Sequence, residues 1–399
     1  QGTAGIAGRV QPPDGNHLEE SGGDGGMKWE IAKLGKIAII RTGKLDSNAA
    51  VIGGRYPFFT CDPNTLSIDV WAYDTEAVLL AGNNASGNYT AKYYKGKFNA
   101  YQRTYIIESA DEEKLNIRYF CYALNQQLRL LKTMSSGSTT KFLTVRMLDN
   151  LDIPLPSINI QTEIVNILSA YDDLIENNQK QIKLLEEAAQ RLYKEWFVDW
   201  RFPGHENTKI VDGVPEGWNE KTLSQVANVI MGQSPKSEFY NSEKKGLPFH
   251  QGVGSYGVRF VMDDIYSTSY TRIAEPNSIL FSVRAPVGRL NITKNKVVIG
   301  RGLAAINQTD GCQSYLYYLL KNRFFKDNIV GNGSIFASVS KDELLNQKFL
   351  IPERNLMMQF EKIVSQMDKQ IENLDSKNKK LIEARDRLLP KLMSGEVEV

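Results

Sequence analysis

Two long stretches of the chain place apolar side chains at alternating steps of four and three residues, from Ile164 to Trp196 and from Phe360 to Leu392. This heptad spacing predicts one long helix with a single apolar stripe in each stretch. At about 1.5 Å per residue, about 35 residues form a rod roughly 50 Å long, and an apolar stripe of that length needs a partner. The stripe positions are Ile164, Leu168, Tyr171, Ile175, Asn178, Ile182, Leu185, Ala189, Leu192 and Trp196, and then Phe360, Val364, Met367, Ile371, Leu374, Asn378, Leu381, Arg385, Leu388 and Leu392.

The two helical stretches are copies of one another. The segments DDLIENNQKQIKLLEEAAQRL, from Asp172, and DKQIENLDSKNKKLIEARDRL, from Asp368, align without a gap, 196 residues apart, with ten identical residues among 21. The spacing W-x4-L-x8-G also occurs twice, from Trp29 and from Trp218. Further matches are Gln161 and Glu163 with Gln359 and Glu361, Gly137-Ser138 with Gly333-Ser334, and Pro57-Phe58 with Pro248-Phe249. The chain is therefore a tandem duplication of a unit of roughly 190 residues.

The sequence before each long helix alternates short apolar runs with turns. The runs KIAIIRTG, AVLLAG, RTYIIES, SILFSVRAP and KVVIGRGLAAINQ predict strands bounded by Gly, Asn and Ser. The stretches EKLNIRYFCYALNQQLRLLK and CQSYLYYLLKNRFFKDNIV place apolar residues three and four apart, which predicts helices. The expected fold class is α+β, with two mixed α/β domains in tandem, each followed by a long helix.

These patterns predict an order of segments along the chain. The first 26 residues are rich in Gly and polar residues and lack the apolar core of a signal peptide. The linker RFPGHENTKIVDGVPEGW has the Pro, Gly and polar content that lets a chain cross over. We expect a vector-derived or disordered tail at 1–26, a first domain at 27–157, a first long helix at 158–202, a linker at 203–215, a second domain at 216–355 and a second long helix at 356–395.

The simplest partner for each apolar stripe is the stripe of the other copy, which would form an intramolecular coiled coil. Alternatively, each helix packs only on its own domain. Since two copies of one unit pack most simply as an isologous pair, the coiled coil implies a pseudo-twofold axis. Asn178 and Asn378 interrupt the stripes, and they either fix the register, because a polar core position sacrifices stability for alignment, or face solvent at a local irregularity.

Composition restricts the class of protein. A chain of 399 residues holds about two to three domains, and no run approaches the roughly 18 apolar residues of a membrane helix, so we expect a soluble, cytoplasmic protein. Cys61, Cys121 and Cys312 stand far apart, and the chain has only three histidines, which argues against disulfides and a structural zinc site.

Charge is unevenly distributed although the net charge is only +2. The windows Ala77–Ile107 and Pro276–Thr309 contain no acidic residue and occupy matching places in the two copies. One basic window is explained equally well by a solvated face, but two matched windows suggest two equivalent contacts with a polymer. Their cations are Lys92, Lys95, Lys97 and Arg103, and Arg284, Arg289, Lys294, Lys296 and Arg301.

We find no convincing catalytic motif in the sequence. It has no phosphate-binding G-x4-G-K-[ST], no H-E-x-x-H and no Pro-Pro-aromatic motif of the amino-methyltransferases. GVGSYG, from Gly252, formally matches a dinucleotide fingerprint, but VRFVMDD follows where a helix should begin, so we interpret it as a Gly-rich loop. Glu243-x-Lys245 fits an exposed turn better than a nuclease motif, and we expect His205 and His250 to be surface or loop residues.

Several segments together resemble one family, the specificity subunits of Type I restriction-modification systems. The resemblance rests on IPLPSINIQTEIV from Ile153, LYKEWFVDWRFPGHE from Leu192, VPEGW from Val214 and RLLPKLMSGEV from Arg387, and it covers Met27 to the C-terminus. It implies two target recognition domains, each reading one half of a bipartite sequence in double-stranded DNA, with the antiparallel long helices as the spacer. It also implies a non-catalytic subunit without its own metal or cofactor.

The family's chemistry resides in other chains. The implied partners are two modification subunits, which carry S-adenosylmethionine and transfer methyl groups, and restriction subunits, which use ATP and Mg in translocation and cleavage. No membrane partner is expected.

Carried over by position, the resemblance places the DNA-contacting side chains in the Gly-broken loops and basic windows, where cations neutralise phosphates and polar side chains reach base edges. In the first copy these are Lys44, Ser47, Thr60, Lys92, Lys95, Lys97, Gln102, Arg103, Ser138, Thr139 and Lys141. In the second copy they are Gln233, Ser234, Lys236, His250, Gln251, Arg284, Arg289, Arg301, Asn332 and Ser334. Arg103 and Arg301 are expected to occupy matched places.

Two other classes of function compete with a DNA specificity subunit. One is a self-contained DNA-modifying enzyme with an unrecognised motif, which would methylate or cut DNA without partners. The other is a coiled-coil scaffold without a nucleic-acid role, which the acid-free windows disfavour.

Overall fold

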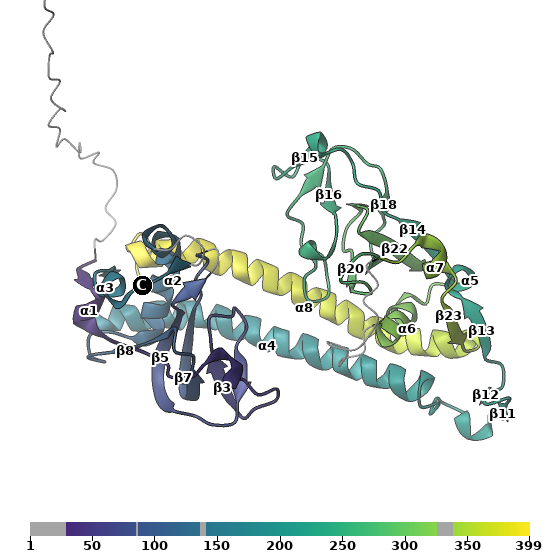
Figure 1. Ribbon diagram of the computed structural model, residues 1–399, viewed down its shortest axis with the longest axis horizontal. Coiled ribbons are helices and arrows are strands. Elements are labelled where there is room, and N and C mark those ends of the chain that lie inside the picture. The colour runs from purple at the N-terminus through teal and green to yellow at the C-terminus, as the bar shows by residue number, and fades with distance from the viewer. Residues whose placement is uncertain (1–28, 85–86, 136–140, 325–337) are drawn as a thin grey trace, which may run out of the picture. The chain divides into compact units, whose positions relative to one another are not determined.

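Figure 1 shows a computed structural model of the chain, which describes residues 29–84, 87–135, 141–324 and 338–399. These residues form two compact units. Unit 1 comprises the described residues up to Leu174 together with Lys380–Val399, and unit 2 comprises Ile175–Lys379. Both units contain helices and strands, which confirms the predicted α+β class. In the described part of the chain, no helix is long and apolar enough to cross a membrane.

Unit 1 is built on a six-stranded sheet in the order β2-β8-β5-β7-β3-β4, antiparallel except between β3 and β7. Helix α2 (Ile117–Met134) packs on this sheet, so that Phe120 and Leu124 share a core with Val78 and Leu80. The side chain of Asn116 accepts hydrogen bonds from the first backbone N–H groups of α2 and caps it. The strands are β2 (Ala38–Thr42), β3 (Tyr56–Phe59), β4 (Leu66–Ile68), β5 (Tyr73–Ala81), β7 (Ala91–Ala100) and β8 (Thr104–Ser109).

Short elements complete unit 1. Two small antiparallel pairs, β1 with β10 and β6 with β9, join segments that are distant in sequence. These elements are β1 (Ile31–Lys33), α1 (Leu34–Ile37), η1 (Ser47–Ala49), β6 (Asn83–Asn84), β9 (Lys141–Phe142), α3 (Val145–Asp149) and β10 (Asp152–Pro154).

Unit 2 contains a four-stranded sheet, β14-β22-β19-β20, and a five-stranded sheet, β15-β17-β16-β21-β18. Helix α6 (Gln313–Phe324) packs on the first sheet through Tyr315, Leu316 and Leu319. The strands are β14 (Ala227–Met231), β15 (Tyr240–Asn241), β16 (Leu247–His250), β17 (Tyr266–Ser267), β18 (Ile273–Ala274), β19 (Ile279–Ser282), β20 (Leu290–Ile292), β21 (Val297–Ile299) and β22 (Leu303–Gln308). The segment GVGSYG forms only the short turn η4 (Val253–Ser255), and no helix begins after it, as expected of a loop.

The remaining elements of unit 2 flank its sheets. They are η2 (His205–Asn207), β11 (Ile210–Val211), β12 (Val214–Pro215), β13 (Asn219–Thr222), α5 (Leu223–Val226), η3 (Ser237–Phe239), α7 (Lys341–Leu345) and β23 (Lys348–Ile351).

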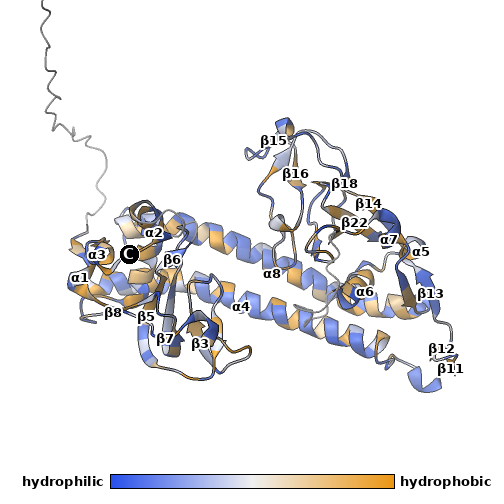
Figure 2. Cartoon of the chain, in the orientation of Figure 1, coloured by the Kyte–Doolittle hydropathy of each residue, from blue (hydrophilic) through white to orange (hydrophobic). Residues whose placement is uncertain are grey.

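The two predicted long helices are α4 (Ile158–Phe197) and α8 (Arg354–Ser394), and Figure 2 shows apolar and polar residues alternating along both. Within unit 2, Asn178 Nδ2 lies 2.8 Å from Asn378 Oδ1, and the Phe197 and Phe360 rings are 5.1 Å apart. Because higher numbers in α4 meet lower numbers in α8, the helices run antiparallel within unit 2. Within unit 1, Leu168 and Leu392 belong to one core.

Each apolar stripe is covered from two sides. Leu168 shares its core with Phe120 of the unit 1 domain as well as with α8. In unit 2, Phe360 lies against Tyr315 of α6 as well as Phe197 of α4. Packing against the opposite helix and packing on the helix's own domain, the two alternatives for each stripe, therefore occur together, because the same side chains contact both.

The helices correct one of the sequence matches. They begin at Ile158 and Arg354, 196 residues apart, and at this spacing the fully buried Ile164 corresponds to the fully buried Phe360. The match of Gln161 with Gln359 requires a spacing of 198 and is therefore wrong as a structural equivalence. The buried apolar positions therefore decide how the two helices align. The identical polar residues in this match lie at positions that do not correspond in the structure.

Candidate nucleic-acid interface

The same backbone framework occurs at one edge of each domain. In unit 1, Gly43 N donates to Thr104 O (3.1 Å), Tyr101 N to Phe59 O (2.8 Å) and Thr104 N to Tyr101 O (2.8 Å). In unit 2, Gly232 N donates to Leu303 O (2.9 Å), Gly300 N to His250 O (2.8 Å) and Leu303 N to Gly300 O (3.0 Å). Three of the four segments that the resemblance assigns to DNA reading therefore converge within each unit, namely 43–47, 57–60 and 101–103, and 232–236, 248–251 and 300–302. Most of the fourth segment, 136–141 and 332–338, lies outside the described residues.

The repeated glycine of the W-x4-L-x8-G spacing is explained by this framework. A Cβ atom on Gly43 would collide with the carbonyl oxygen of Ala100, and one on Gly232 would collide with that of Gly300. Only glycine permits such a close approach of two backbones.

The framework also corrects the expected pairing of Arg103 with Arg301. Since Tyr101 corresponds to Gly300 and Thr104 to Leu303, Arg301 corresponds to Gln102 and Arg103 to Gly302. The two arginines follow matched strand ends but differ by one position, so they occupy different places in their domains.

Unit 2 has a pocket of about 700 Å³ at this edge. Five predicted DNA-contacting residues line it: Gln233, Ser234, Lys236, Gln251 and Arg301. Pro235, within the predicted loop segment 232–236, also lines it, and the sequence did not single out three other lining residues, Ser237, Glu238 and Tyr240. The only signal that could have identified them is their place directly after Gly232, because no motif or charge pattern marks them.

Polar contacts inside the pocket fix one side chain. Arg301 N donates to Ser234 Oγ (3.2 Å), and Ser234 Oγ donates to Gln251 Oε1 (3.0 Å). Gln251 and Arg301 are both exposed. Lys236 Nζ lies 3.7 Å from Glu238 Oε1, at the exposed part of the lining. The pocket thus presents amide, guanidinium and ammonium donors together with one carboxylate.

His250 does not have the surface position expected from its sequence. It ends β16, its side chain is fully buried, Nδ1 lies 2.9 Å from Ser255 Oγ, and Nε2 lies 3.2 Å from Asp263 Oδ1. That expectation is wrong because the strand turns this side chain inward. Only its backbone carbonyl, which binds Gly300, contributes to the framework. His205, in η2, is partly exposed as expected.

Unit 1 presents different side chains on the same framework. Gln102 Nε2 donates to Asp46 Oδ1 (2.6 Å), and Thr60 is buried. Arg103 lines a pocket of about 330 Å³ together with Thr42 and Tyr105. Lys44 and Ser47 are exposed in the loop that follows Gly43.

The basic windows are partly neutralised by acids from elsewhere in the fold. Lys95 Nζ lies 2.7 Å from Glu76 Oε2. Outside the predicted set, Lys294 lies 2.7 Å from Asp375 of α8 and therefore anchors the domain to its helix. Sequence windows exclude acids that are near in sequence, but they do not exclude acids that folding brings close.

The other predicted cations occupy varied settings. Lys92 donates to Thr65 Oγ1 (3.2 Å), and burial lowers the pKa of its amine. Lys97 lies over the Trp71 ring, 4.6 Å from its centroid. Lys141 lies in β9, Arg284 is exposed, and Arg289 lines a separate pocket of about 410 Å³. Ser138, Thr139, Asn332 and Ser334 lie outside the described residues.

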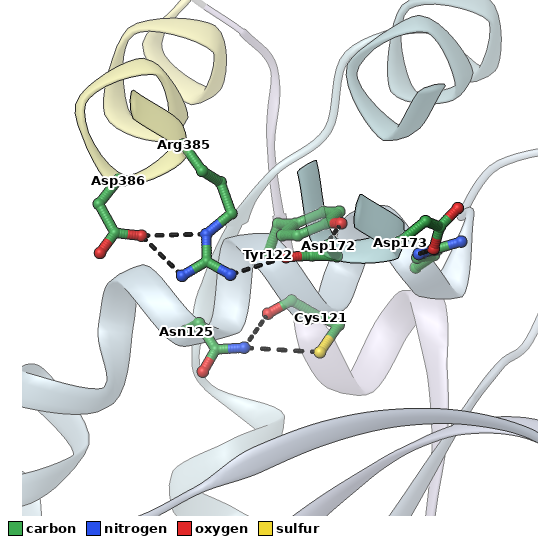
Figure 3. Close-up of polar contacts among 8 residues, drawn as sticks. Cys121, Tyr122, Asn125, Asp172, Asp173, Arg385 and Asp386 are labelled. Atoms are coloured by element: carbon green, nitrogen blue, oxygen red, sulfur yellow. Dashed lines mark hydrogen bonds and ion pairs between the residues drawn. The ribbon is translucent and has the colours of Figure 1, made fainter. Parts of the chain in front are cut away.

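Asp172 anchors the unit 1 domain to both long helices. It accepts hydrogen bonds from the Tyr122 hydroxyl and from Arg385 Nη1 (2.7 Å), as Figure 3 shows. Burial and the bond to Asp172 both raise the pKa of Tyr122, so its hydroxyl stays protonated and donates. Arg385 also binds Asp386 (2.8 Å).

Unit 2 anchors its domain with a buried arginine. Arg259, only 3% exposed, binds Asp368 of α8 and Glu186 of α4 (3.3 Å). Its guanidinium also lies 4.2 Å from the centroid of the Tyr317 ring. One side chain of the domain therefore contacts both helices. Among the described residues, no group of three or more His, Cys, Asp or Glu side chains could hold a metal ion.

Comparison with known proteins gives consistent matches over most of the chain. The family model for the Type I restriction modification DNA specificity domain matches residues 27–187 and again 215–384. The chain is similar to a putative type I restriction enzyme MjaX specificity subunit of Methanocaldococcus jannaschii, with 29% identity covering 77% of this chain and 74% of that protein. It is also similar to the EcoDI specificity subunit of Escherichia coli, with 31% identity covering 51% of this chain and 50% of that protein.

The fold is also found among solved structures. The crystal structure of a Type I restriction-modification S subunit from M. genitalium superimposes with a TM-score of 0.60 and 18% identity, covering 94% of this chain and 97% of that one.

Proposed function

The chain belongs to the Type I restriction modification DNA specificity family, and from that premise we propose that it selects the bipartite DNA sequence on which a Type I restriction-modification complex acts. In this proposal each unit reads one half-site. The observation that carries it is the repeated loop framework, which occurs once in each of the two segments matched by the family model.

The proposed readout uses two kinds of contact. Exposed cations such as Lys44 and Lys236 neutralise phosphates and position the DNA without regard to sequence. Side chains held on the framework, such as Gln251 and Arg301, reach base edges and select the sequence. The division matters because the first set changes affinity for all DNA alike, whereas the second changes preference among sequences.

The proposed role is non-catalytic. In the complex, the chain recruits two modification subunits, which use S-adenosylmethionine, and restriction subunits, which use ATP and Mg. The contact of each domain with a long helix supports a scaffolding role, because Tyr122 binds Asp172 of α4 in unit 1 and Arg259 binds Glu186 of α4 in unit 2.

The test is to assemble the chain with the modification subunit of its system and map methylated sites by single-molecule sequencing. We expect one bipartite sequence with a fixed spacer, and binding that weakens steeply as salt concentration rises. Methylation or cleavage by the chain alone would instead identify an enzyme. Failure to bind DNA with the modification subunit present would leave a scaffold without a nucleic-acid role.

A further inference from the structure

The polar side chains that line the pocket of unit 2 have hydrogen-bond partners that limit which of their donors and acceptors are available. Resting on the proposed function, we propose that Gln251 and Arg301 read a guanine in the second half-site, and that Ser234 is a positioning residue that turns the Gln251 amide into a donor. The bases that a glutamine reads depend on which end of its amide is available, so the argument begins with the orientation of that amide.

The hydrogen bonds around Ser234 determine this orientation. A backbone N–H can only donate, so the 3.2 Å contact of Arg301 N with Ser234 Oγ makes the hydroxyl an acceptor there. The single hydroxyl hydrogen then goes to Gln251 Oε1, 3.0 Å away. If the amide were rotated, one of its N–H groups would donate to the second lone pair of Ser234 Oγ, and the hydroxyl hydrogen would lose the one acceptor that it has among the described residues. The Gln251 NH₂ group is therefore the end left for the pocket.

Close backbone packing keeps the hydrogen-bonded chain from Arg301 N through Ser234 Oγ to Gln251 Oε1 in place. A Cβ atom on Gly300 would lie 3.0 Å from both Gln251 Oε1 and Ser234 Oγ, a distance that would displace them. Gly302 also approaches the backbone carbonyl of Gln251 closely. Glycine at both positions allows the 300–302 loop to pack against this hydrogen-bonded chain, so the Gln251 amide is oriented before DNA binds.

The available donors match guanine better than any other base. In the major groove guanine presents two acceptors, N7 and O6, whereas adenine presents one acceptor and one donor, and cytosine presents a donor. A glutamine with both ends available reads adenine, because its oxygen accepts from the adenine amine. Here that oxygen accepts from Ser234, and Arg301 adds guanidinium donors, for which no acceptor is found among the described residues. An adenine amine at this position would face donors.

Glu238 offers an alternative to base contacts by Gln251 and Arg301. Its carboxylate is the one anionic acceptor of the lining, and it lies 3.7 Å from Lys236 Nζ. If Glu238 made the base contact, the pocket would prefer a base with an exposed amine, adenine or cytosine. The effect of Glu238→Gln on base preference therefore distinguishes this reading from the proposed one.

The experiment uses the full chain assembled with its modification subunit and DNA duplexes in which each base pair of the mapped second half-site is changed in turn. Wild type should prefer guanine over adenine at one position, and 7-deazaguanine, which lacks the N7 acceptor, should weaken binding there. Ser234→Ala should reduce the guanine-to-adenine preference roughly tenfold, because the Gln251 amide can then rotate. Arg301→Ala should weaken binding to the guanine duplex on the order of tenfold or more.

Matched variants separate positioning from simple loss of structure. Ser237→Ala makes the same change in the same pocket, and Ser234→Thr keeps the hydroxyl, so both should retain the guanine preference. A second half-site without guanine, an unchanged preference in Ser234→Ala, or a preference lost in Glu238→Gln would overturn this inference while leaving the proposed function intact. Absence of any sequence-selective binding by the wild-type complex would instead refute the proposed function.

Discussion

Units 1 and 2 hold their predicted DNA-reading loops with the same backbone hydrogen bonds but place different side chains on them. Ser234, Gln251 and Arg301 correspond to Leu45, Thr60 and Gln102, of which Thr60 is buried and Gln102 is bound to Asp46. The duplicated part is therefore the frame, which depends on backbone groups and glycine. The side chains on the frame are independent of it, so two copies of one fold can read different bases.

The anchors of the two domains differ in a similar way. Asp172 and Asp368 correspond, and each lies near an equivalent tyrosine, Tyr122 or Tyr318. The arginine of the first comes from α8 and is partly exposed, whereas the arginine of the second, Arg259, comes from its own domain and is buried. The equivalent carboxylates Asp172 and Asp368 are thus each paired with an arginine, but the two arginines come from different elements and do not correspond.

Removing the two anchoring arginines should have the largest effect on this comparison. Arg259→Met leaves the carboxylates of Glu186 and Asp368 without their buried cation, and we expect unit 2 to lose about 3–5 kcal/mol of unfolding free energy. Arg385→Met should cost about 1 kcal/mol or less, because that side chain is 27% exposed. Urea denaturation followed by tryptophan fluorescence measures both. Equal losses would contradict the difference in anchoring.

The asparagine pair should have the next largest effect. Both side chains are buried and bonded to each other, so neither faces solvent, and their role in fixing the register stays a prediction. Asn178→Leu alone leaves Asn378 Oδ1 without its donor, although Asn378 Nδ2 still donates to Ile175 O (3.4 Å), and should cost about 1–3 kcal/mol. The double variant with Asn378→Leu should melt above wild type while blurring the half-site spacing. Strictly additive single effects would show that the two amides do not interact.

A fragment containing the first copy tests how far the copies can replace each other. At the spacing of 196 residues, Asn378 corresponds to Ile182, so a homodimer of residues 27–213 would place each Asn178 against Ile182 of its partner. We expect a dimer that selects an inverted repeat of the first half-site. Asn178→Leu should strengthen this dimer on the order of tenfold, because it removes an unpaired amide from the interface. Asn177→Leu, at an exposed position, is the control. Ultracentrifugation showing a stable monomer for both fragments would refute the pseudo-dimer account.

The smallest expected effect concerns Arg103. Because it corresponds to Gly302 rather than Arg301, we expect a phosphate contact, so Arg103→Ala should weaken binding several-fold for all sequences and reduce the salt slope by about 0.9. Titrations of target and scrambled duplexes at several salt concentrations measure this. A change in base preference at the first half-site would instead identify a base contact.

Local patterns were sufficient for the elements and for part of the site. The heptad spacing predicted α4 and α8, because an apolar stripe is a local property of the helix. The loops carrying Gln233, Ser234, Lys236, Gln251 and Arg301 were placed by the resemblance to the specificity-subunit family, carried over by position, and these residues line one pocket. Glu238 and Tyr240 were missed because neither carries a local signal.

The sequence by itself determined the duplication, the helical stripes and the glycines that mark the loops, because each of these depends on neighbours along the chain. Tertiary structure decided which side chains meet. The spacing between corresponding residues changes from 189 at Gly43 and Gly232 to 199 at Thr104 and Leu303, so only the backbone bonds reveal that Arg301 matches Gln102. Folding likewise turned His250 inward and brought Asp375 to Lys294. Such contacts join residues far apart in sequence, and their geometry depends on the packing of whole elements.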